Sequence, residues 1–180
     1  MTEATPPKST VEARLGSTDP RISEFLDAWR ASRRDTMVPL RRDFEPSRIP
    51  GLLPHVWLYR YEPDRGDFVC RLAGEEINAA WGRSIKGETL RAVLGEADHP
   101  TVLRRWQRIV SVPLLHYGSA VERLSALETR SAERLLVPLA SDDETIDYML
   151  GLSLYKISMA NFDRMPLVPE DIVQIPCAEV

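Results

Sequence analysis

Residues 54–90 read PHVWLYRYEPDRGDFVCRLAGEEINAAWGRSIKGETL, and this stretch decides the fold class. It contains two apolar segments, residues 55–61 and 68–72, which flank a turn cluster at residues 63–67. Apolar segments separated by a short loop rich in Pro, Asp and Gly predict a β-hairpin. We therefore expect two antiparallel strands at the start of the domain.

The second half of this stretch changes its apolar period. Ile77 and Trp81 are four residues apart, which places them on one side of a helix. Three glycines divide the segment into short pieces, namely Gly74, Gly82 and Gly87. We expect short helical elements here, and a structural role for the glycines.

Length and composition predict one globular domain with extensions. The chain has 180 residues, of which 43% are hydrophobic and 28% charged. Its formal net charge is −4, which gives no electrostatic reason to expect nucleic acid as a partner. No apolar run reaches the roughly 20 residues of a membrane helix, and the N-terminal residues lack the apolar core of a signal peptide. Cys70 and Cys177 are far apart in the sequence and do not indicate a disulfide framework. From the cysteines and the lack of a long apolar run, we expect a cytoplasmic protein without a membrane partner.

The N-terminal part is expected to hold a flexible lead-in over residues 1–18 and a helix with a linker over residues 19–52. Asp19 is the expected N-cap, with Pro20 at the first helical position. The helix has one apolar stripe, formed by Ile22, Phe25, Leu26 and Trp29. This stripe must pack either on its own domain or on a second copy, and we expect it to form a homodimer interface together with the outer sheet face.

A basic cluster follows this stripe, made of Arg30, Arg33, Arg34, Arg41 and Arg42. Cations complement the C-terminal end of a helix dipole, and this structural explanation is the simpler one. The alternative is a surface for an anionic partner.

Both faces of the first strand carry apolar side chains. Trp57 and Tyr59 point one way and Val56 and Leu58 the other, so we expect each face of the sheet to be covered. A long amphipathic helix is predicted over residues 99–112, with Asp98 as its N-cap.

Three further strands are predicted at residues 119–127, 133–139 and 146–155, joined by short connections. The fold class is therefore α+β, with a five-stranded antiparallel sheet and helices packed over one face. This domain should span residues 53–156, followed by a C-terminal extension over residues 157–180.

The residues predict no catalytic motif. His55, His99 and His116 lack metal-ligand spacing and have ordinary capping or edge explanations. Neither a nucleophile motif nor a phosphate-binding loop is present in the sequence, so we expect no metal site and no enzyme activity. The alternative is a small α+β enzyme of the cone-shaped barrel type, in which His116, Glu122 and Arg71 would converge on one cavity.

An apolar space between helices and sheet is the expected ligand site, with a filled core as the alternative. The side chains expected to line it are Cys70, Leu72, Ile77, Trp81, Leu103, Trp106, Val110, Val137 and Leu152.

Three segments, LPHVWLYRY (53–61), DFVCRLAGEEINAAWGRSIKGETL (67–90) and LLVPLASDDETIDYMLGLSLY (135–155), resemble the family of small bacterial proteins that consist of little more than one PAS domain. The resemblance implies a five-stranded antiparallel sheet with helices across one face. It gives Arg71 a mainly structural role, as it does Gly74, Gly82 and Gly87.

PAS domains generally sense small molecules, redox state or light, or mediate protein contacts, so the resemblance implies a sensory or interaction module that signals through a separate effector protein. A flavin is not expected, because Cys70 lacks the flanking sequence of flavin photoreceptor domains. Haem is not expected either, because neither His99 nor His116 is placed as an axial ligand on a pocket helix.

Overall fold

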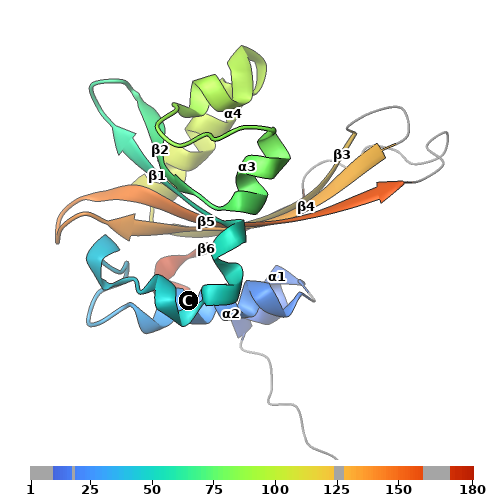
Figure 1. Cartoon of the computed structure of the whole chain (residues 1–180). Coiled ribbons are helices and arrows are strands. Elements are labelled where there is room, and N and C mark those ends of the chain that lie inside the picture. Colours follow the sequence, from blue (N-terminus) through green and yellow to red (C-terminus); the bar gives the residue numbers. More distant parts are fainter. Residues whose placement is uncertain (1–9, 18, 124–127, 160–170) are drawn as a thin grey trace, which may run out of the picture.

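The computed structural model describes residues 10–17, 19–123, 128–159 and 171–180 (Figure 1). The N-terminal elements are two helices and three short 3-10 turns: α1 (Thr10–Leu15), α2 (Pro20–Ala31), η1 (Arg41–Asp43), η2 (Pro46–Arg48) and η3 (Pro50–His55). The remaining elements are β1 (Val56–Glu62), β2 (Asp67–Ala73), α3 (Glu75–Trp81), α4 (Leu90–Ser111), β3 (Leu114–Arg123), β4 (Glu128–Ala140), β5 (Ile146–Met159), β6 (Asp171–Pro176) and the 3-10 turn η5 (Cys177–Glu179).

The strands form one antiparallel sheet in the order β2-β1-β5-β4-β3-β6. The expected α+β class and antiparallel sheet are confirmed, and the sheet has six strands where five were expected. The additional strand, β6, comes from the expected C-terminal extension and pairs along the first half of β3. Its apolar residue Ile175 is fully buried, which explains why this segment packs on the sheet.

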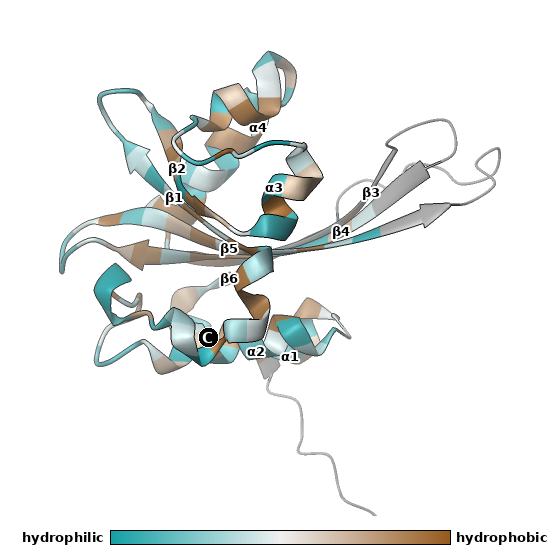
Figure 2. Ribbon diagram, in the orientation of Figure 1, coloured by the Kyte–Doolittle hydropathy of each residue, from teal (hydrophilic) through white to brown (hydrophobic). Residues whose placement is uncertain are grey.

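Helices cover the two faces of the sheet. Figure 1 shows α3 and α4 on one side and α1, α2 and the short turns on the other. The alternation along β1 accounts for this, because Val56 and Leu58 join the core under α2 while Trp57 and Tyr59 join the core under α4. Figure 2 shows hydrophobic residues on the described inner parts of the sheet and hydrophilic residues at the β1–β2 turn.

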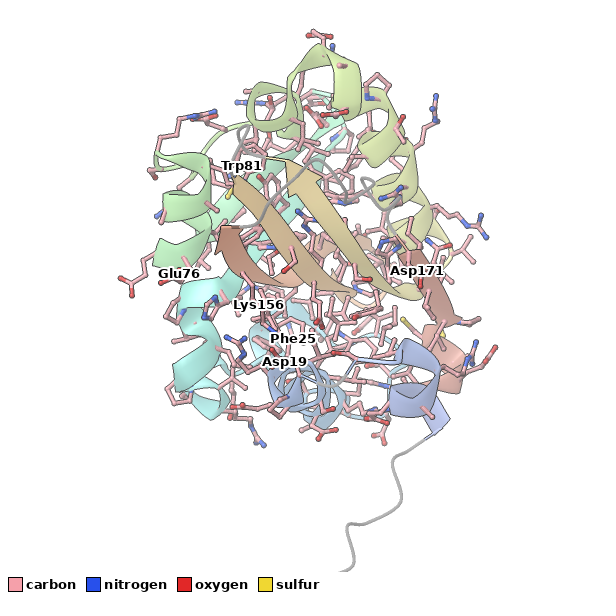
Figure 3. All side chains as sticks on the ribbon, turned by 90° about the vertical axis from the view of Figure 1, so that its right-hand side faces the viewer. Asp19, Phe25, Glu76, Trp81, Lys156 and Asp171 are labelled. Atoms are coloured by element: carbon pink, nitrogen blue, oxygen red, sulfur yellow. The ribbon has the colours of Figure 1, made fainter. Side chains whose placement is uncertain are left out.

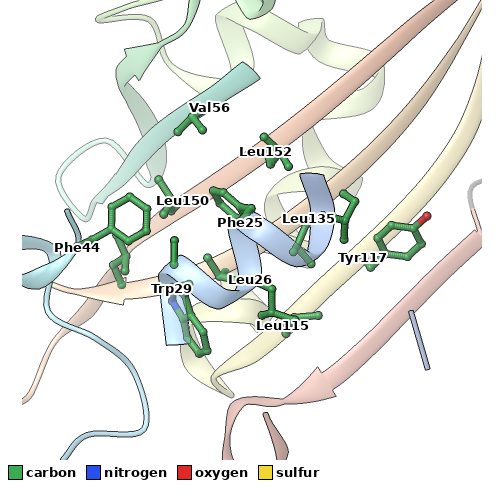
Figure 4. Packing of buried hydrophobic residues seen from close by; sticks show 14 of the residues in the cluster. Phe25, Leu26, Trp29, Phe44, Val56, Leu115, Tyr117, Leu135, Leu150 and Leu152 are labelled. Atoms are coloured by element: carbon green, nitrogen blue, oxygen red, sulfur yellow. The ribbon is translucent and has the colours of Figure 1, made fainter. Parts of the chain in front are cut away.

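Helix α2 packs against its own sheet (Figure 4). Asp19 caps it by accepting a hydrogen bond from the Arg21 backbone N–H at 3.1 Å. Ile22, Phe25, Leu26 and Trp29 are all buried, and the Trp29 indole N–H donates to the Pro138 carbonyl oxygen at 3.0 Å. The expectation of a homodimer interface through these four side chains is therefore wrong, because they leave no exposed apolar stripe for a second copy.

The expected lead-in contains a helix. Residues 10–15 form α1, with Val11 and Leu15 buried in the core under α2, so the expectation of flexibility is wrong for this part. Residues 1–9 and 18 of the expected lead-in lie outside the described residues.

The long helix begins nine residues before its expected start. Thr89 caps α4 by accepting a hydrogen bond from the Ala92 backbone N–H at 3.1 Å, and Asp98 lies inside the helix rather than at its N-cap. The helix is kinked at Gly95, whose φ of 79° is available to glycine at little cost. This kink interrupts the apolar period, which is why the first part of the helix was not predicted.

The three later strands start or end outside their expected limits. β3 begins at Leu114, so His116 lies within a strand instead of before it. β4 begins at Glu128 and β5 continues to Met159. Part of the expected third strand, residues 124–127, lies outside the described residues. No helix in the described ranges combines the length and apolar character needed to cross a membrane.

Candidate functional site

A cavity of about 550 Å³ lies between the sheet and the elements α3 and α4. This volume is within the range of roughly 300–1,000 Å³ that is typical of small-molecule sites. The cavity is lined by Trp57, Tyr59, Ile77, Trp81, Ile85, Leu90, Val93, Leu94, Asp98, Thr101, Val102, Arg105, Trp106, His116, Ala120, Arg134, Leu136, Ser153 and Tyr155. Figure 3 shows Trp81 on α3 at one side of the sheet and Phe25 on the opposite side.

Small residues on three neighbouring strands create the space for this cavity. Gly118 and Ala120 of β3 alternate with side chains of the other face, and they lie opposite Arg134 and Ala132 of β4. On β5, Ser153 lies opposite Arg134. Because these side chains are short, they do not fill the space between the sheet and the helices, and a hollow remains.

Aromatic side chains form part of the cavity wall. The rings of Trp57 and Trp106 stack with centroids 5.1 Å apart and planes 7° apart, and Tyr59 meets both rings edge to face. The Trp57 indole N–H donates to Ser153 Oγ at 2.8 Å. Opposite Trp57, Gly151 leaves room for the indole, since a Cβ at Gly151 would lie 2.1 Å from the ring. These contacts fix the orientation of the Trp57 ring.

Asn78 holds the α3 side of the cavity together. Its side-chain N–H donates to the Ala73 carbonyl oxygen at 3.2 Å, and its Oδ1 accepts from the Ile85 backbone N–H at 3.1 Å. This second bond turns Ile85 into the cavity lining, where it is fully buried. Neither Asn78 nor Ile85 was predicted from the sequence to contribute to this site.

The three glycines of this region differ in geometry. Gly82 ends α3 in the left-handed conformation, with φ at 65°, and Gly87 has φ at 86°. At Gly74 the backbone is ordinary, but a Cβ would lie 2.2 Å from the Pro54 carbonyl oxygen. Glycine is required there by a close approach of two backbone segments.

Polar and charged side chains also line the cavity. Arg134 of β4 is half-buried, and its guanidinium lies 5.8 Å from the centre of the Tyr155 ring. Arg105 reaches the cavity from α4. In the described ranges, no group of three or more His, Cys, Asp or Glu side chains is arranged to hold a metal ion.

His116 connects the cavity to the edge strand β6. Its ring is 2% exposed and lines the cavity, and Gln174 Nε2 of β6 lies 3.1 Å from His116 Nδ1 in a hydrogen bond. The expectation of an edge position outside the sheet is therefore wrong. The reason is that β3 starts five residues earlier than its apolar alternation indicated.

His99 is also buried, where a capping position was expected. Its Nε2 lies 3.1 Å from Asp67 Oδ1, and the other carboxylate oxygen of Asp67 accepts from the Arg91 backbone N–H at 3.1 Å. This contact ties α4 to the start of β2. His99 does not line the cavity.

Burial changes the acidity of two neighbouring groups under α4. It raises the pKa of the Cys70 thiol to about 11, and it also raises the pKa of the Tyr59 hydroxyl, with Cys70 as the next cause. Both groups are protonated at neutral pH. Cys70 therefore lacks the thiolate character of a nucleophile.

Three of the nine expected lining residues lie at the cavity: Ile77, Trp81 and Trp106. Three others, Cys70, Leu103 and Val110, pack in the same core without lining the cavity.

The remaining three expected lining residues lie elsewhere. Leu72 is 43% exposed, because a bulge in the β1–β2 pairing changes its position relative to Cys70. Val137 and Leu152 belong to the core under α2. The alternation of side chains along β4 and β5 correctly predicted which residues share a face of the sheet. The face with the larger apolar residues, however, packs under α2 and does not line the cavity. The small residues at 118, 120, 132, 151 and 153 were the available signal for a cavity.

The three polar groups of the enzyme alternative do not converge. Arg71 is exposed at the edge of the sheet, where its guanidinium pairs with Glu62, and it does not line the cavity that contains His116. The side chain of Glu122 lies outside the described part of the structure.

The antiparallel sheet, the helices over it and the cavity beneath them are the features of a PAS domain, and a comparison of the sequence with protein families agrees. The sequence model of the family described as PAS domain matches residues 18–154, so this chain belongs to the PAS domain family. The match includes α2, the strands β1 to β4 and the greater part of β5, and it ends before β6. PAS domains are generally sensory and interaction modules without catalytic activity. No curated protein matches this chain.

Proposed function

We propose that this PAS domain is a sensor that binds a small amphipathic molecule in the cavity between α3, α4 and the sheet. The observation that carries the proposal is the cavity of about 550 Å³, whose lining combines aromatic rings with polar and charged side chains. The cavity is partly open to solvent, so a small molecule can enter it. Its polar lining makes it suitable for a ligand with both apolar and polar parts.

We also propose that occupancy of the cavity is passed to a separate effector protein. Support comes from the hydrogen bond between His116 at the cavity and Gln174 on β6. Strand β6 continues into Cys177, which is buried under α2, and the Val180 carbonyl oxygen accepts from the Arg33 guanidinium at 2.7 Å. A ligand that displaces His116 would thus act on β6 and on the end of α2. Two unpaired buried cysteines support a cytoplasmic location for this sensor.

Native mass spectrometry of the purified protein, combined with a thermal-shift screen of small molecules, tests the binding proposal. A ligand at 100 times its Kd adds about 2.7 kcal/mol to the free energy of unfolding, which raises the Tm by roughly 5–11 °C for a domain of this size. The blocking variant is Ala120→Phe, which places a phenyl ring in the cavity.

The matched control for this variant is Ala97→Phe on the exposed surface of α4. We expect hits from the screen to stabilise the wild type and Ala97→Phe, but not Ala120→Phe. If the protein retains no ligand and no compound raises its Tm, or if the blocking variant responds like the wild type, the cavity is not a binding site.

A further inference from the structure

We infer that the ligand of this cavity is an apolar carbonyl compound whose oxygen accepts a hydrogen bond from the hydroxyl of Ser153. This inference rests on the proposed ligand-binding function and specifies the chemical class of the ligand. The burial of Ser153, the hydrogen bond that its oxygen accepts and the aromatic rings beside it support the inference.

Ser153 is a buried polar residue of the cavity wall. It is 1% exposed and lines the cavity from β5. Gly151, two positions earlier on the strand, points to the same face of the sheet and leaves room there for the Trp57 indole. The hydroxyl of Ser153 therefore lies at the floor of the cavity, beside the nitrogen edge of this indole.

The hydroxyl of Ser153 has one hydrogen-bond partner among the residues that the structure describes, namely the Trp57 indole N–H. Ser153 Oγ accepts this bond at 2.8 Å. A serine hydroxyl also has a proton to donate, whereas an indole N–H is a donor only. The proton of Ser153 must therefore be accepted by a different group, and the cavity that Ser153 lines is the place where this group binds.

This buried donor selects for a ligand with an acceptor atom. A buried polar group that stays unpaired costs free energy comparable to a lost hydrogen bond, so a hydrocarbon placed over Ser153 would bind at a disadvantage. A carbonyl oxygen accepts the bond and brings no proton that needs an acceptor of its own. A site with a buried donor also discriminates strongly against analogues that lack the matching group.

The aromatic rings beside Ser153 indicate that the rest of the ligand is apolar and flat. Trp57, Tyr59 and Trp106 all line the cavity, where the two indoles stack and the tyrosine ring meets both edge to face. Ile77 of α3 adds aliphatic surface to the same lining. Flat apolar molecules pack favourably against such rings, and a carbonyl oxygen on Ser153 Oγ places the attached body beside Trp57.

A matched pair of naphthalenes tests this class. Acetylnaphthalene carries a carbonyl group, and isopropenylnaphthalene, substituted at the same ring position, has the same shape with a methylene group in place of the oxygen. Equilibrium dialysis measures the Kd of both compounds for the wild type, Ser153→Ala, Ser153→Thr and the blocking variant Ala120→Phe. The control is Ser111→Ala, which removes an exposed hydroxyl at the end of α4, outside the cavity.

We expect Ser153→Ala to bind the ketone about tenfold more weakly than the wild type does, the range for a buried acceptor that loses its donor, and the alkene within about twofold. Loss of the bond to Trp57 affects both compounds, so the ratio of their affinities isolates the hydrogen bond to the ligand. Ser153→Thr should retain the ratio of the wild type, because it keeps the hydroxyl. Ser111→Ala should match the wild type, and Ala120→Phe should bind neither compound.

Infrared difference spectroscopy of the bound ketone, isotope-labelled at its carbonyl carbon, adds a readout that a merely structural role of Ser153 would not change. A hydrogen bond to the oxygen lowers the carbonyl stretching frequency. The bound ketone should therefore absorb at a lower frequency in the wild type and Ser153→Thr than in Ser153→Ala. Near-UV circular dichroism of each variant verifies that the fold is retained.

Two results overturn the inference while leaving the binding site intact: affinities for the two compounds that Ser153→Ala leaves unchanged or lowers equally, or an unchanged carbonyl frequency. If neither naphthalene binds the wild type, the hits of the ligand screen decide. Hits that all bind Ser153→Ala as tightly as the wild type overturn the inference, and carbonyl-containing hits that Ser153→Ala weakens about tenfold support it. An absence of hits overturns the proposed function and this inference with it.

Discussion

The contact between Gly151 and Trp57 predicts a large effect of the substitution Gly151→Ala. The Cβ of the new alanine would lie 2.1 Å from the indole ring, whereas ordinary contact begins at 3.4 Å. The ring must therefore retreat by about 1.3 Å. Such a movement breaks the bond of 2.8 Å from the Trp57 N–H to Ser153 Oγ and shifts the stack of 5.1 Å with Trp106.

The size of the effect follows from these contacts. Overpacking of a core costs roughly 1–3 kcal/mol, and the lost hydrogen bond costs about 1 kcal/mol. Replacing glycine in a strand interior recovers about 0.5–1 kcal/mol, because alanine has less freedom to lose on folding. We expect a net loss of about 2 kcal/mol in the free energy of unfolding. This loss lowers the Tm of a domain of this size by roughly 4–8 °C.

Thermal unfolding and near-UV circular dichroism, which reports the coupled tryptophans, measure the two consequences. The control is Gly51→Ala, since a Cβ at Gly51 meets no atom within 4 Å and its φ is not positive. We expect this control to stay within about 0.5 kcal/mol of the wild type. A Tm of Gly151→Ala equal to that of the control, with an unchanged tryptophan spectrum, would refute the argument that Trp57 occupies the space above Gly151.

Other contacts give further predictions. Gly74→Ala should cost about 3 kcal/mol in urea unfolding and Gly82→Ala only about 1, because a Cβ at Gly74 meets rigid backbone oxygens, whereas Gly82 has open space and a positive φ alone; equal losses would contradict this reasoning. Phe25→Ala should lower the free energy of unfolding by about 3–5 kcal/mol without changing the association state in sedimentation, since the ring is fully buried within the chain; a changed association state at full stability would return the ring to an interface. The thiols of Cys70 and Cys177, with pKa values raised by burial to about 11 and about 12, should react with a disulfide reagent at pH 8 only as fast as the protein unfolds. Since the folded pKa values exceed the ordinary value of 9.0, these thiols stabilise the fold fully below pH 9 and progressively less as the pH rises toward 11, so the urea midpoint should fall over this interval; a constant midpoint there would contradict the raised pKa values.

Local patterns in the sequence were sufficient for the fold class and much of α2. The hairpin at residues 56–73 depends on alternation and a turn cluster, which act between close neighbours in the chain. The Asp19 cap and the apolar stripe of α2 likewise follow from the spacing of three and four residues. The stripe did not reveal its partner, because an apolar surface packs equally well on its own sheet or on another copy.

The candidate site was predictable only in part, for a physical reason that β5 illustrates. The alternation along β5 places Leu150 and Leu152 on one face and Gly151 and Ser153 on the other. The strand sequence does not show which of these two faces lies under α3 and α4. We assigned the large side chains to the cavity, and the structure places them in the filled core under α2.

The sequence by itself determined the class of the fold, the existence of two covered sheet faces and the family to which the chain belongs. Only the tertiary structure decided which face holds the cavity, that β6 completes the sheet, and that Arg134, His116 and Trp57 share one site. These features depend on contacts between residues far apart in the chain, such as the opposition of Gly118, Arg134 and Ser153 across three strands. Such contacts are set by strand register and by the volumes of facing side chains, which local periodicity does not encode.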